Sequence, residues 1–442
     1  MADGGRRLAL INAGAVATGP ASSGPVRHPT WDDVGLRQGV GIGVEDGRVA
    51  LIASDEEVGE WFHSAIYPET VVDCEGRLVT AGLVDPHTHA LFGQPRLADH
   101  ARRARGDDYK AIAAAGGGIL SSVADFRQRG IENLVALALP RLAMMGALGT
   151  TTVEIKSGYG LATDPELRAL RAIAQLRRSV PLRLVSTFLG AHEVPPEYRS
   201  RRDAYVRLVI EEMLPVVARE NLATFCDVFC EPGVFSVGES EAILVAAARH
   251  GLALKVHADE LDPSGGAELA ARLGAASADH LWAISSAGIE ALAASETVAV
   301  LLPGTLLFLG KTSQAPGRAL LDAGAVVALA TDFNPGTSPT VNLPLMMALA
   351  VSQARLQPEE AFIAATANAA HALLLGGERG RIAVGAPADL VVWNCRDVRE
   401  LAYWYGIPLA WRVYASGRPC QGSGPGISSA GSGGRPLSPP LS

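Results

Sequence analysis

The stretch LVTAGLVDPHTH, residues 78–89, contains the first of several short apolar runs that decide the fold. It is rich in Leu and Val and ends in polar residues, as a buried β-strand does. Seven similar runs follow, and stretches of helical character rich in Ala, Leu, Arg and Glu separate them. The predicted strands are LVTAGLVDPH (78–87), GTTTVEIKSG (149–158), LRLVSTFLGAH (182–192), ATFCDVFCEP (223–232), LALKVHADE (252–260), ASADHL (276–281), TVAVLLPG (297–304) and AVVALATDFNPG (325–336). Eight strands that alternate with helices predict an α/β fold, a parallel (β/α)8 TIM barrel.

The two ends of the chain lie outside this repeat and predict a second, smaller domain. Residues 39–54, GVGIGVEDGRVALIAS, have the pattern of a strand, an Asp-Gly turn and a second strand, which is a hairpin. Residues 379–394 and 410–419 alternate apolar and polar positions, as half-buried strands do. We therefore predict a small β-sandwich-like domain from residues 1–77 and 377–420, the barrel from residues 78–376, and a disordered Gly/Ser/Pro-rich tail at residues 421–442.

Composition and charge exclude several classes of partner. Of the 442 residues, 48% are hydrophobic and 19% are charged, so the chain can bury a large core. The formal net charge is -8, and no basic block could follow a phosphate backbone, which argues against nucleic acid. No apolar run is long enough to span a membrane. An anionic substrate would need a local cation in such an acidic chain.

Two features bear on the cellular compartment. Residues 6–17, RRLALINAGAVA, resemble a short secretory signal, but a first β-strand that runs into a Gly-rich turn explains them equally well. The cysteines are an odd number and widely scattered, which is not typical of a disulfide framework. They are Cys74, Cys226, Cys230, Cys395 and Cys420. We expect buried, reduced thiols and a cytoplasmic protein.

The connection from about residue 91 to residue 148 is longer than the others and contains three consecutive glycines, Gly116, Gly117 and Gly118. A flexible substrate lid near the barrel mouth and a glycine-rich turn between helices both fit this pattern.

Five of the ten histidines fall at or just after predicted strand ends, where barrel enzymes place their catalytic groups. His87 and His89 are one residue apart, so on an extended backbone both imidazoles point to one side and can share a cation. A structural pair of hydrogen-bonded histidines is the alternative. His257 ends the fifth strand and Asp332 ends the eighth, and the four side chains suit Zn²⁺ or Fe²⁺ with one position left for water. Since a bound cation lowers the pKa of water from about 15.7 to about 7, hydrolysis is the expected reaction class.

Two further side chains are candidates for proton transfer. Glu260 follows His257 by three residues and could take a proton from the water and pass it to a leaving nitrogen; a solvated loop carboxylate is the alternative. His280 ends the sixth strand and could act as a base or orient the water, or it could be a satisfied core histidine. The histidines away from strand ends are predicted to be surface or packing residues: His28, His63, His100, His250 and His371.

Several motifs between residues 86 and 347 resemble the amidohydrolase superfamily and, within it, the imidazolonepropionase family. They are PHTHALFGQPR (86–96), AAAGGGI (113–119), TTTVEIKSGYGL (150–161), FLGAH (188–192), KVHADE (255–260) and ATDFNPGTSPTVNLPLMM (330–347), with GAPADLVVW (385–393) as a later superfamily mark. One departure concerns the reach of Arg96, because Gln94 and Pro95 stand where relatives often carry Gly-Ser.

The resemblance implies a barrel with a small β domain built from both termini and one Zn²⁺ or Fe ion (Fe²⁺ or Fe³⁺). It implies hydrolysis of the cyclic amide C–N bond of 4-imidazolone-5-propanoate to N-formimidoyl-L-glutamate, a step of histidine degradation. The matched positions are the metal ligands His87, His89, His257 and Asp332, the substrate contacts Arg96, Tyr159, His192, Glu260, Asn334, Gly336 and Thr337, and the catalytic residues Glu260, His280 and Asp332. We also expect a homodimer that acts on a small anionic molecule.

The chemistry of the matched residues agrees with this activity. Arg96 offers a planar fork that can bind a carboxylate through two bonds, although a free surface arginine is the alternative. Tyr159 is flanked by glycines that permit close approach of a ligand, and its hydroxyl can bind a ring or carboxylate oxygen, although it could be a turn residue. His192 could polarise the ring carbonyl, and Asn334 with the backbone of residues 336–337 could hold a polar edge of the substrate.

Two other functions compete with this hypothesis. A deaminase of the same superfamily, acting on a heterocyclic base, would use similar histidine pairs and a similar His-x-x-Glu run. A non-catalytic scaffold would keep the fold without its site, since fold alone fixes no function. Arg96 and the SGYG and FNPGTSP segments argue against the deaminase, and the full ligand set argues against the scaffold.

Overall fold

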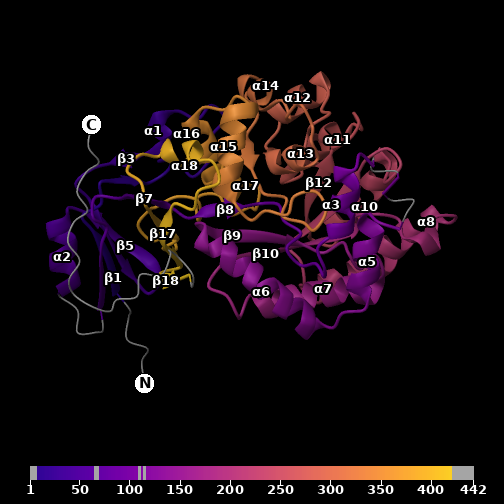
Figure 1. Cartoon of the computed structure of the whole chain (residues 1–442), viewed down its shortest axis with the longest axis horizontal. Helices are drawn as coiled ribbons and strands as arrows, with labels where there is room; N and C mark the ends of the chain where they lie inside the picture. The colour runs from indigo at the N-terminus through magenta and orange to yellow at the C-terminus, as the bar shows by residue number, and fades with distance from the viewer. Residues whose placement is uncertain (1–6, 64–68, 108–110, 113–115, 421–442) are drawn as a thin grey trace.

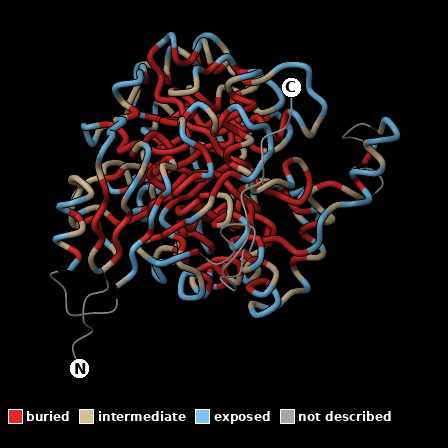
Figure 2. The backbone as a smooth tube through the Cα atoms, turned by 60° about the vertical axis from the view of Figure 1, so that its left-hand side comes forward, coloured by how far each residue is buried: buried red, intermediate tan, exposed pale blue. Residues whose placement is uncertain are grey.

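The structure is a computed structural model, and it describes residues 7–63, 69–107, 111–112 and 116–420. The predicted tail at residues 421–442 lies outside the described residues. Figure 1 shows a barrel surrounded by helices on one side of the molecule and a smaller β-rich part on the other. Strands from both ends of the chain lie in the smaller part, and buried backbone runs through the centre of both (Figure 2).

The barrel consists of eight parallel strands hydrogen-bonded in the order β15-β14-β13-β12-β11-β10-β9-β8, which confirms the predicted fold class. They are β8 (Leu83–Asp85), β9 (Thr150–Lys156), β10 (Arg183–Ala191), β11 (Phe225–Cys230), β12 (Ala253–Ala258), β13 (Ser277–His280), β14 (Val298–Leu301) and β15 (Val327–Leu329). Residues just after the first and last strands close the ring. The Asp332 N–H donates to the His87 carbonyl at 3.1 Å, and the His89 N–H donates to the Phe333 carbonyl at 2.9 Å. The seam of the barrel is therefore also the place where predicted metal ligands meet.

The first predicted strand, residues 78–87, is two strands in two different sheets. β7 (Leu78–Ala81) pairs with strands of the small domain, and only β8 enters the barrel. Gly82 separates them, and a Cβ atom on Gly82 would lie 2.1 Å from Thr151 Oγ1, so the backbone passes too close to β9 for any side chain. The apolar character of the run continues across this break because both halves are buried.

Helices follow most barrel strands and cover the outside of the ring (Figure 1). They are α3 (Leu97–Ala104), α5 (Ile119–Arg127), α6 (Ile131–Ala147), α7 (Thr163–Leu176), the 3₁₀ turn η1 (Pro196–Tyr198), α8 (Arg202–Arg207), the π-helix η2 (Leu208–Met213), α9 (Leu214–Arg219), α10 (Val237–Arg249), α11 (Gly266–Leu273), α12 (Ser286–Ala293), α13 (Pro303–Phe308), α14 (Gly317–Asp322), α15 (Leu343–Gln353), α16 (Pro358–Ala364) and α17 (Ala367–His371). α10 shows how the sequence begins a helix, because Ser236 and Glu239 form a reciprocal capping box at its N-terminus.

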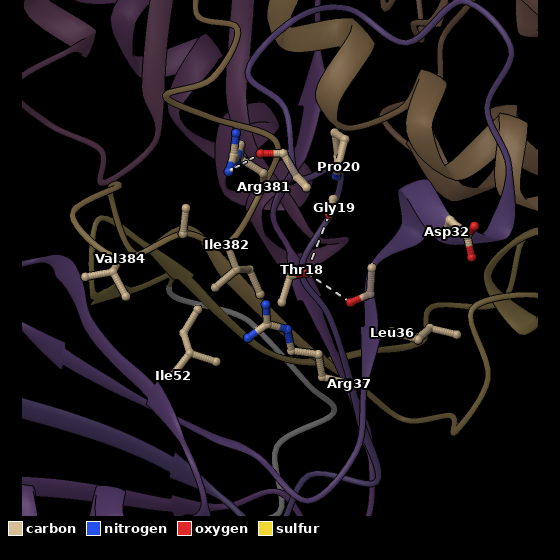
Figure 3. Close-up of a pocket in the computed structure, with 13 residues that line it drawn as sticks. Thr18, Gly19, Pro20, Asp32, Leu36, Arg37, Ile52, Arg381, Ile382 and Val384 are labelled. Carbon is tan, nitrogen blue, oxygen red and sulfur yellow. Dashed lines mark hydrogen bonds between the residues drawn. The ribbon is translucent and has the colours of Figure 1, made fainter.

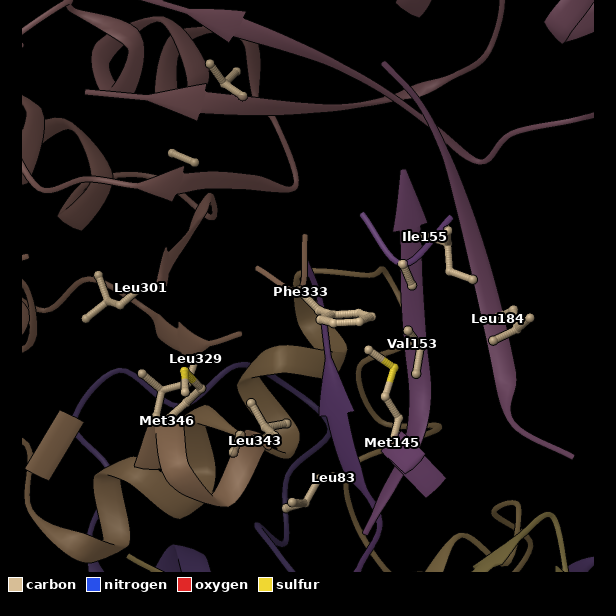
Figure 4. Close-up of a cluster of buried hydrophobic side chains, with 14 of the residues drawn as sticks. Leu83, Met145, Val153, Ile155, Leu184, Leu301, Leu329, Phe333, Leu343 and Met346 are labelled. Atoms are coloured by element: carbon tan, nitrogen blue, oxygen red, sulfur yellow. The ribbon is translucent and has the colours of Figure 1, made fainter. Parts of the chain in front are cut away.

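Alternation along β9 separates the apolar layer from the barrel interior. Val153 and Ile155 belong to the apolar cluster between the strands and the helices, together with Met145 of α6 (Figure 4). The intervening residues Glu154 and Lys156 must point the other way, into the barrel, because successive side chains of a strand alternate. Both are fully buried, so the interior of this barrel contains charge.

The chain ends form two further sheets, which confirms the predicted extra β domain built from both termini. One sheet has the order β5-β4-β1-β6 and the other has the order β18-β17-β16-β7-β2-β3. The elements are β1 (Arg7–Ile11), β2 (Ala15–Ala17), α1 (Trp31–Val34), β3 (Leu36–Arg37), β4 (Gly41–Glu45), β5 (Arg48–Ala53), α2 (Asp55–His63), β6 (Glu69–Asp73), β16 (Leu390–Trp393), α18 (Glu400–Tyr403), β17 (Ala410–Ala415) and β18 (Arg418–Pro419). The predicted hairpin is present, and Asp46 and Gly47 in its turn have φ of 51° and 77°.

Three other predictions have a structural outcome. The apolar run after residue 6 contains the strand β1, as predicted by the interpretation of this run as a first β-strand. Gly117 and Gly118 lie between α3 and α5, with the Gly118 N–H donating to Asp99 Oδ2 at 2.9 Å, while residues 113–115 lie outside the described part of the chain. Whether this connection also moves as a lid stays a prediction. Among the described residues, none of the helices combines the length and hydropathy needed to cross a bilayer.

The cysteine thiols are expected to be unreactive in the folded protein. Cys74, Cys226, Cys230 and Cys395 are buried free thiols, and burial raises the pKa of Cys74 and of Cys395 to about 12. A thiol with that pKa is thiolate at about one part in 10⁴ at pH 8. Ellman's reagent should therefore label these four thiols only after unfolding in guanidinium chloride, and rapid labelling of the folded protein would contradict their burial.

Candidate active site

Four predicted ligand side chains converge at the C-terminal end of the barrel. Asp332 Oδ1 lies 3.5 Å from His87 Nε2 and 3.6 Å from His89 Nε2. His257 Nε2, from β12, lies 3.4 Å from His89 Nε2. Donor atoms of His87, His89 and Asp332 all lie within 4.8 Å of one another, and His257 forms similar groups with each of these histidines. All four side chains are almost fully buried, so the arrangement could hold one metal ion.

The hydrogen bonding of His87 shows which nitrogen is available to a cation. Burial, with the nearby charge of Lys156, lowers the pKa of His87 well below its ordinary value, so the imidazole is neutral. Its Nδ1 lies 2.6 Å from the Asp279 carboxylate, which can only accept, so Nδ1 carries the proton. Nε2 is then a bare lone pair, and it is buried without a hydrogen-bond partner in the described structure. An orphaned donor atom of this kind fits a metal ligand.

A network of buried charges lies in the barrel interior next to these ligands, and none of its members was among the predicted site residues. Lys156 Nζ lies 2.7 Å from Asp227 Oδ2 and 2.9 Å from Glu154 Oε2. Asp227 Oδ2 lies 3.0 Å from His257 Nδ1, just as Asp279 lies against His87. Charged residues in the middle of otherwise apolar strands were the available signal, because a fully buried charge requires a partner.

Glu260 is fixed by a second carboxylate. Glu260 Oε2 lies 3.5 Å from His280 Nε2. Glu231 accepts the backbone N–H groups of Glu260, Leu261 and Asp262 at 2.8–3.3 Å and so holds the loop after β12. Burial, with the charges of Asp332 and Glu231, raises the pKa of Glu260 well above its ordinary value, which suits a group that exchanges protons near neutral pH. Glu231 is a further residue that the sequence analysis missed.

Left-handed backbone occurs at several strand ends of this site. His280 has a φ of 81°, and Asp332 and Asp259 each have a φ of 51°. Non-glycine residues adopt such angles uncommonly, although Asp and His do so more often than most. Backbone strain of this kind clusters where side chains are held for function.

Tyr159 stands on a loop that two side chains hold from opposite sides. Glu166 of α7 accepts three backbone N–H groups of residues 158–161 at 2.7–3.0 Å. Arg127 donates to two carbonyl groups of the same residues at 2.8 and 3.0 Å. Tyr159 itself is only 5% exposed. The loop that carries Tyr159 is therefore held in place by contacts within the protein.

His192 lies beside this loop, and its tautomer changes the role predicted for it. Its ring stacks on His89 with centroids 4.9 Å apart. Burial, with His257 nearby, lowers the pKa of His192 to about 3, so the ring is neutral. Its Nδ1 lies 3.0 Å from the Gly158 carbonyl and must be the protonated nitrogen. Nε2 therefore accepts hydrogen bonds, and a neutral His192 cannot donate to a carbonyl from that atom.

The segment after β15 folds on itself through Asn334. Asn334 Oδ1 accepts the backbone N–H groups of Gly336 and Thr337 at 2.8 and 2.7 Å, and Nδ2 donates to the Asp332 carbonyl at 2.7 Å. The side chain predicted to meet a substrate therefore shapes the loop next to the Asp332 ligand. The two N–H groups of this loop are already used within it.

Arg96 lies directly against this loop. A Cβ atom on Gly336 would lie 1.1 Å from Arg96 Nη2, so only glycine leaves room for the guanidinium. Arg96 Nε is buried and has no hydrogen-bond partner in the described part of the chain, and Asp99 Oδ2 lies 3.7 Å away. Arg103 donates to the Gly336 carbonyl at 3.4 Å and brings a second guanidinium to the same place. The structure thus brings all twelve predicted positions into one region and concentrates positive charge at its Arg96 side.

A hollow of about 460 Å³ occurs elsewhere, on the small domain (Figure 3). It is lined by residues from both ends of the chain, among them Thr18, Arg37, Arg381 and Ile382. Thr18 Oγ1 donates to the Gly35 carbonyl at 2.9 Å, and Arg381 donates to backbone carbonyls of residues 21–22. None of the predicted site residues lines this hollow.

Comparison with known proteins gives a consistent result. Residues 78–408 match the model of the amidohydrolase family. The chain is 44% identical over 408 residues to an imidazolonepropionase from Bacillus cereus, covering 92% of this chain and 95% of that protein. It is also similar to a solved triazine hydrolase variant, with a TM-score of 0.72, 17% identity and coverage of 93% and 94% of the two chains. An adenosine deaminase from Xanthomonas campestris with bound zinc gives a TM-score of 0.64 at 18% identity, with coverage of 94% and 92%. At such identities the two structures show the fold alone.

Proposed function

The chain belongs to the amidohydrolase family, and from this premise we propose how its site residues open the ring of an imidazolone. Its similarity to imidazolonepropionases makes it a hydrolase that cleaves the cyclic amide C–N bond of 4-imidazolone-5-propanoate and yields N-formimidoyl-L-glutamate. The observation that supports this proposal best is that a cluster of possible metal ligands and a buried arginine lie in the same site. Convergent histidine and aspartate donors lie within ligand distance of one another, and Arg96, whose Nε makes no hydrogen bond to any described residue, lies at the edge of the same site.

The family depends on a metal, and we propose that His87, His89, His257 and Asp332 hold one Zn²⁺ or Fe ion (Fe²⁺ or Fe³⁺). Three imidazoles and one carboxylate suit either metal. When bound, such an ion lowers the pKa of a coordinated water to about 7 and polarises the ring carbonyl.

The protein residues supply proton transfer and orientation in this proposal. Glu260 takes a proton from the attacking water and delivers it to the ring nitrogen that leaves, while His280 at 3.5 Å keeps the carboxylate directed at the site. His192 accepts a ring N–H through Nε2, the role that its tautomer permits, in place of polarising the carbonyl. Tyr159 lies beside His192 and offers its hydroxyl as a hydrogen-bonding group to the substrate. Asp332 is catalytic through its place in the ligand set.

The propanoate group would bind at Arg96. Its guanidinium is nearly buried and lies against Gly336, and its Nε, 3.7 Å from Asp99 Oδ2, makes no hydrogen bond to any described residue. A carboxylate in that position would make two charge-assisted bonds and would offset the charge that Arg103 adds. This subsite favours an imidazolone acid over a neutral heterocycle, which argues against the deaminase alternative.

Gly336→Ala is expected to raise KM for imidazolonepropionate by about 10- to 100-fold, because the new methyl group displaces Arg96 and weakens charge-assisted bonds of about 1.5–3 kcal/mol each. The kcat value should change less, since the donor cluster is untouched. Gly238→Ala is a matched control, because a Cβ there meets no atom within 4 Å. Steady-state kinetics on both variants measure the effect, and an unchanged KM in Gly336→Ala would show that Arg96 does not bind the carboxylate.

The activity itself is tested by ultraviolet-monitored loss of freshly prepared imidazolonepropionate with protein of known metal content. We expect turnover by the metal-loaded protein and none after chelation. No turnover by metal-loaded protein would reject the proposed substrate. Ammonia release from a panel of nucleobases would instead support the deaminase.

Three further expectations stay predictions. We propose that the chain forms a homodimer, acts in the cytoplasm, and serves histidine degradation. Sedimentation analysis of the purified protein tests the first of these directly.

A further inference from the structure

Lys156 occupies the centre of the buried charge network in the barrel. Its Nζ lies 2.7 Å from Asp227 Oδ2, 2.9 Å from Glu154 Oε2 and 3.6 Å from Asp279 Oδ2. All four side chains are completely buried. One ammonium group therefore lies between three carboxylates that come from strands β9, β11 and β13.

Two of these carboxylates each also contact a proposed metal ligand, through the same oxygen that faces Lys156. Asp227 Oδ2 lies 3.0 Å from His257 Nδ1, and Asp279 Oδ2 lies 2.6 Å from His87 Nδ1. The same oxygen of Asp279 also faces Lys156. We propose that Lys156 is a positioning residue that aligns two ligand imidazoles through their aspartates and so sets the affinity of the metal centre. The proposal rests on the proposed metal site.

The physical reason is that the two aspartates cannot keep these positions without a shared cation. Unscreened carboxylates in the barrel interior repel one another and lose their hydration, so without Lys156 they would turn apart or recruit other partners. Burial alone would lower the pKa of Lys156, but Asp227, Glu154 and Asp279 together raise it above its ordinary value, which agrees with a firmly charged ammonium. Asp279 in turn fixes the tautomer of His87 through a hydrogen bond, and Asp227, 3.0 Å from His257 Nδ1, constrains the direction of that ring.

Lys255 provides a matched control on the neighbouring strand. It is also completely buried, but its Nζ hydrogen-bonds to the carbonyls of Pro86 and Ala372 at 3.2 and 3.4 Å. The carboxylates nearest to it, those of Glu154 and Asp279, lie 3.8 and 3.9 Å away. Removal of Lys255 therefore deletes a buried cation whose shortest contacts are to backbone carbonyls, and the 2.7 Å contact between Lys156 and Asp227 stays intact.

The test compares the zinc affinity of the wild type, Lys156→Met and Lys255→Met by competition with a chromophoric chelator. We expect Lys156→Met to bind Zn²⁺ about 10- to 100-fold more weakly, the range seen when outer partners of metal ligands are removed, and Lys255→Met to remain within about threefold of the wild type. The visible absorption of the Co²⁺-loaded proteins should change in Lys156→Met alone, because the ligand geometry changes there.

The outcomes separate the inference from the function on which it rests. A wild type that binds no Zn²⁺ contradicts the proposed metal site itself. A wild type that binds Zn²⁺ tightly, together with a folded Lys156→Met that binds it equally well or a Lys255→Met that loses as much affinity, contradicts only the role of Lys156.

A double variant covers the case in which Lys156→Met does not fold. Glu154→Gln combined with Lys156→Met removes one charge of each sign, so the cluster keeps its net charge while the bridge between Asp227 and Asp279 is lost. We expect the same weakened zinc binding. Wild-type affinity in this double variant would show that net charge alone matters, and would overturn the inference.

Discussion

Glu260→Gln is expected to lower kcat for imidazolonepropionate by about 10²- to 10⁴-fold while the metal content stays at the wild-type level. Glutamine keeps the size of the side chain and can still meet His280, which lies 3.5 Å from the carboxylate. It cannot accept the proton of the attacking water or return one to the leaving nitrogen. The backbone at this position remains held by Glu231, so the loop should keep its shape. Steady-state kinetics, with metal analysis of the same samples, measure the effect.

Asp262→Asn is the control for this experiment. Asp262 lies two residues further along the same loop, its backbone is held by the same Glu231 carboxylate, and its side chain is exposed. The control should keep kcat within about twofold, as surface substitutions usually do. A kcat that is unchanged in Glu260→Gln, or that falls equally in both variants, would remove Glu260 from the proton transfer.

His257→Ala is expected to abolish stable metal binding and to lower kcat/KM by at least about 10³-fold, because the water then loses the cation that brings its pKa near neutrality. The variant also leaves Asp227 without the imidazole that it contacts at 3.0 Å. Metal content after gel filtration and hydrolysis of imidazolonepropionate measure the two losses together.

His250→Ala is the matched control, since His250 is an exposed residue at the end of α10. It should retain both the metal and the activity. If His257→Ala retained a full equivalent of metal, the four-ligand proposal would have to be replaced by the group of His87, His89 and Asp332, the one of the three candidate groups among the described residues that lacks His257.

The barrel was predictable because its strands are short apolar runs and most of them end in polar residues; β14, which runs on into Leu302 and Pro303, is an exception. The break at Gly82 was not predictable from periodicity. Both halves of residues 78–87 are buried and apolar, and they differ only in which sheet they join. That difference depends on contacts with Thr151 and with β16, which lie far away in the sequence.

The site residues could be predicted from their types and their places at strand ends, whereas the directions of some side chains could not. Asn334 bonds to its own loop, and the tautomer of His192 depends on the Gly158 carbonyl, a contact that only the folded chain creates. Lys156 and Asp227 could have been found, since a charge within a buried strand needs a partner. Sequence order does not reveal which charges meet inside a barrel, because the partners come from different strands.

The six-stranded sheet of the small domain has a consequence for how the protein is made. Its strand β7 ends at Ala81, whereas its neighbour β16 begins at Leu390, after the whole barrel. A ribosome that adds about 5–20 residues per second needs on the order of tens of seconds to synthesise the chain between them. During that time β7 presents an unpaired apolar edge, the kind of surface on which nascent chains aggregate. Any truncation before Leu390 would make this exposure permanent, so the last strands of the chain protect strands that were synthesised first.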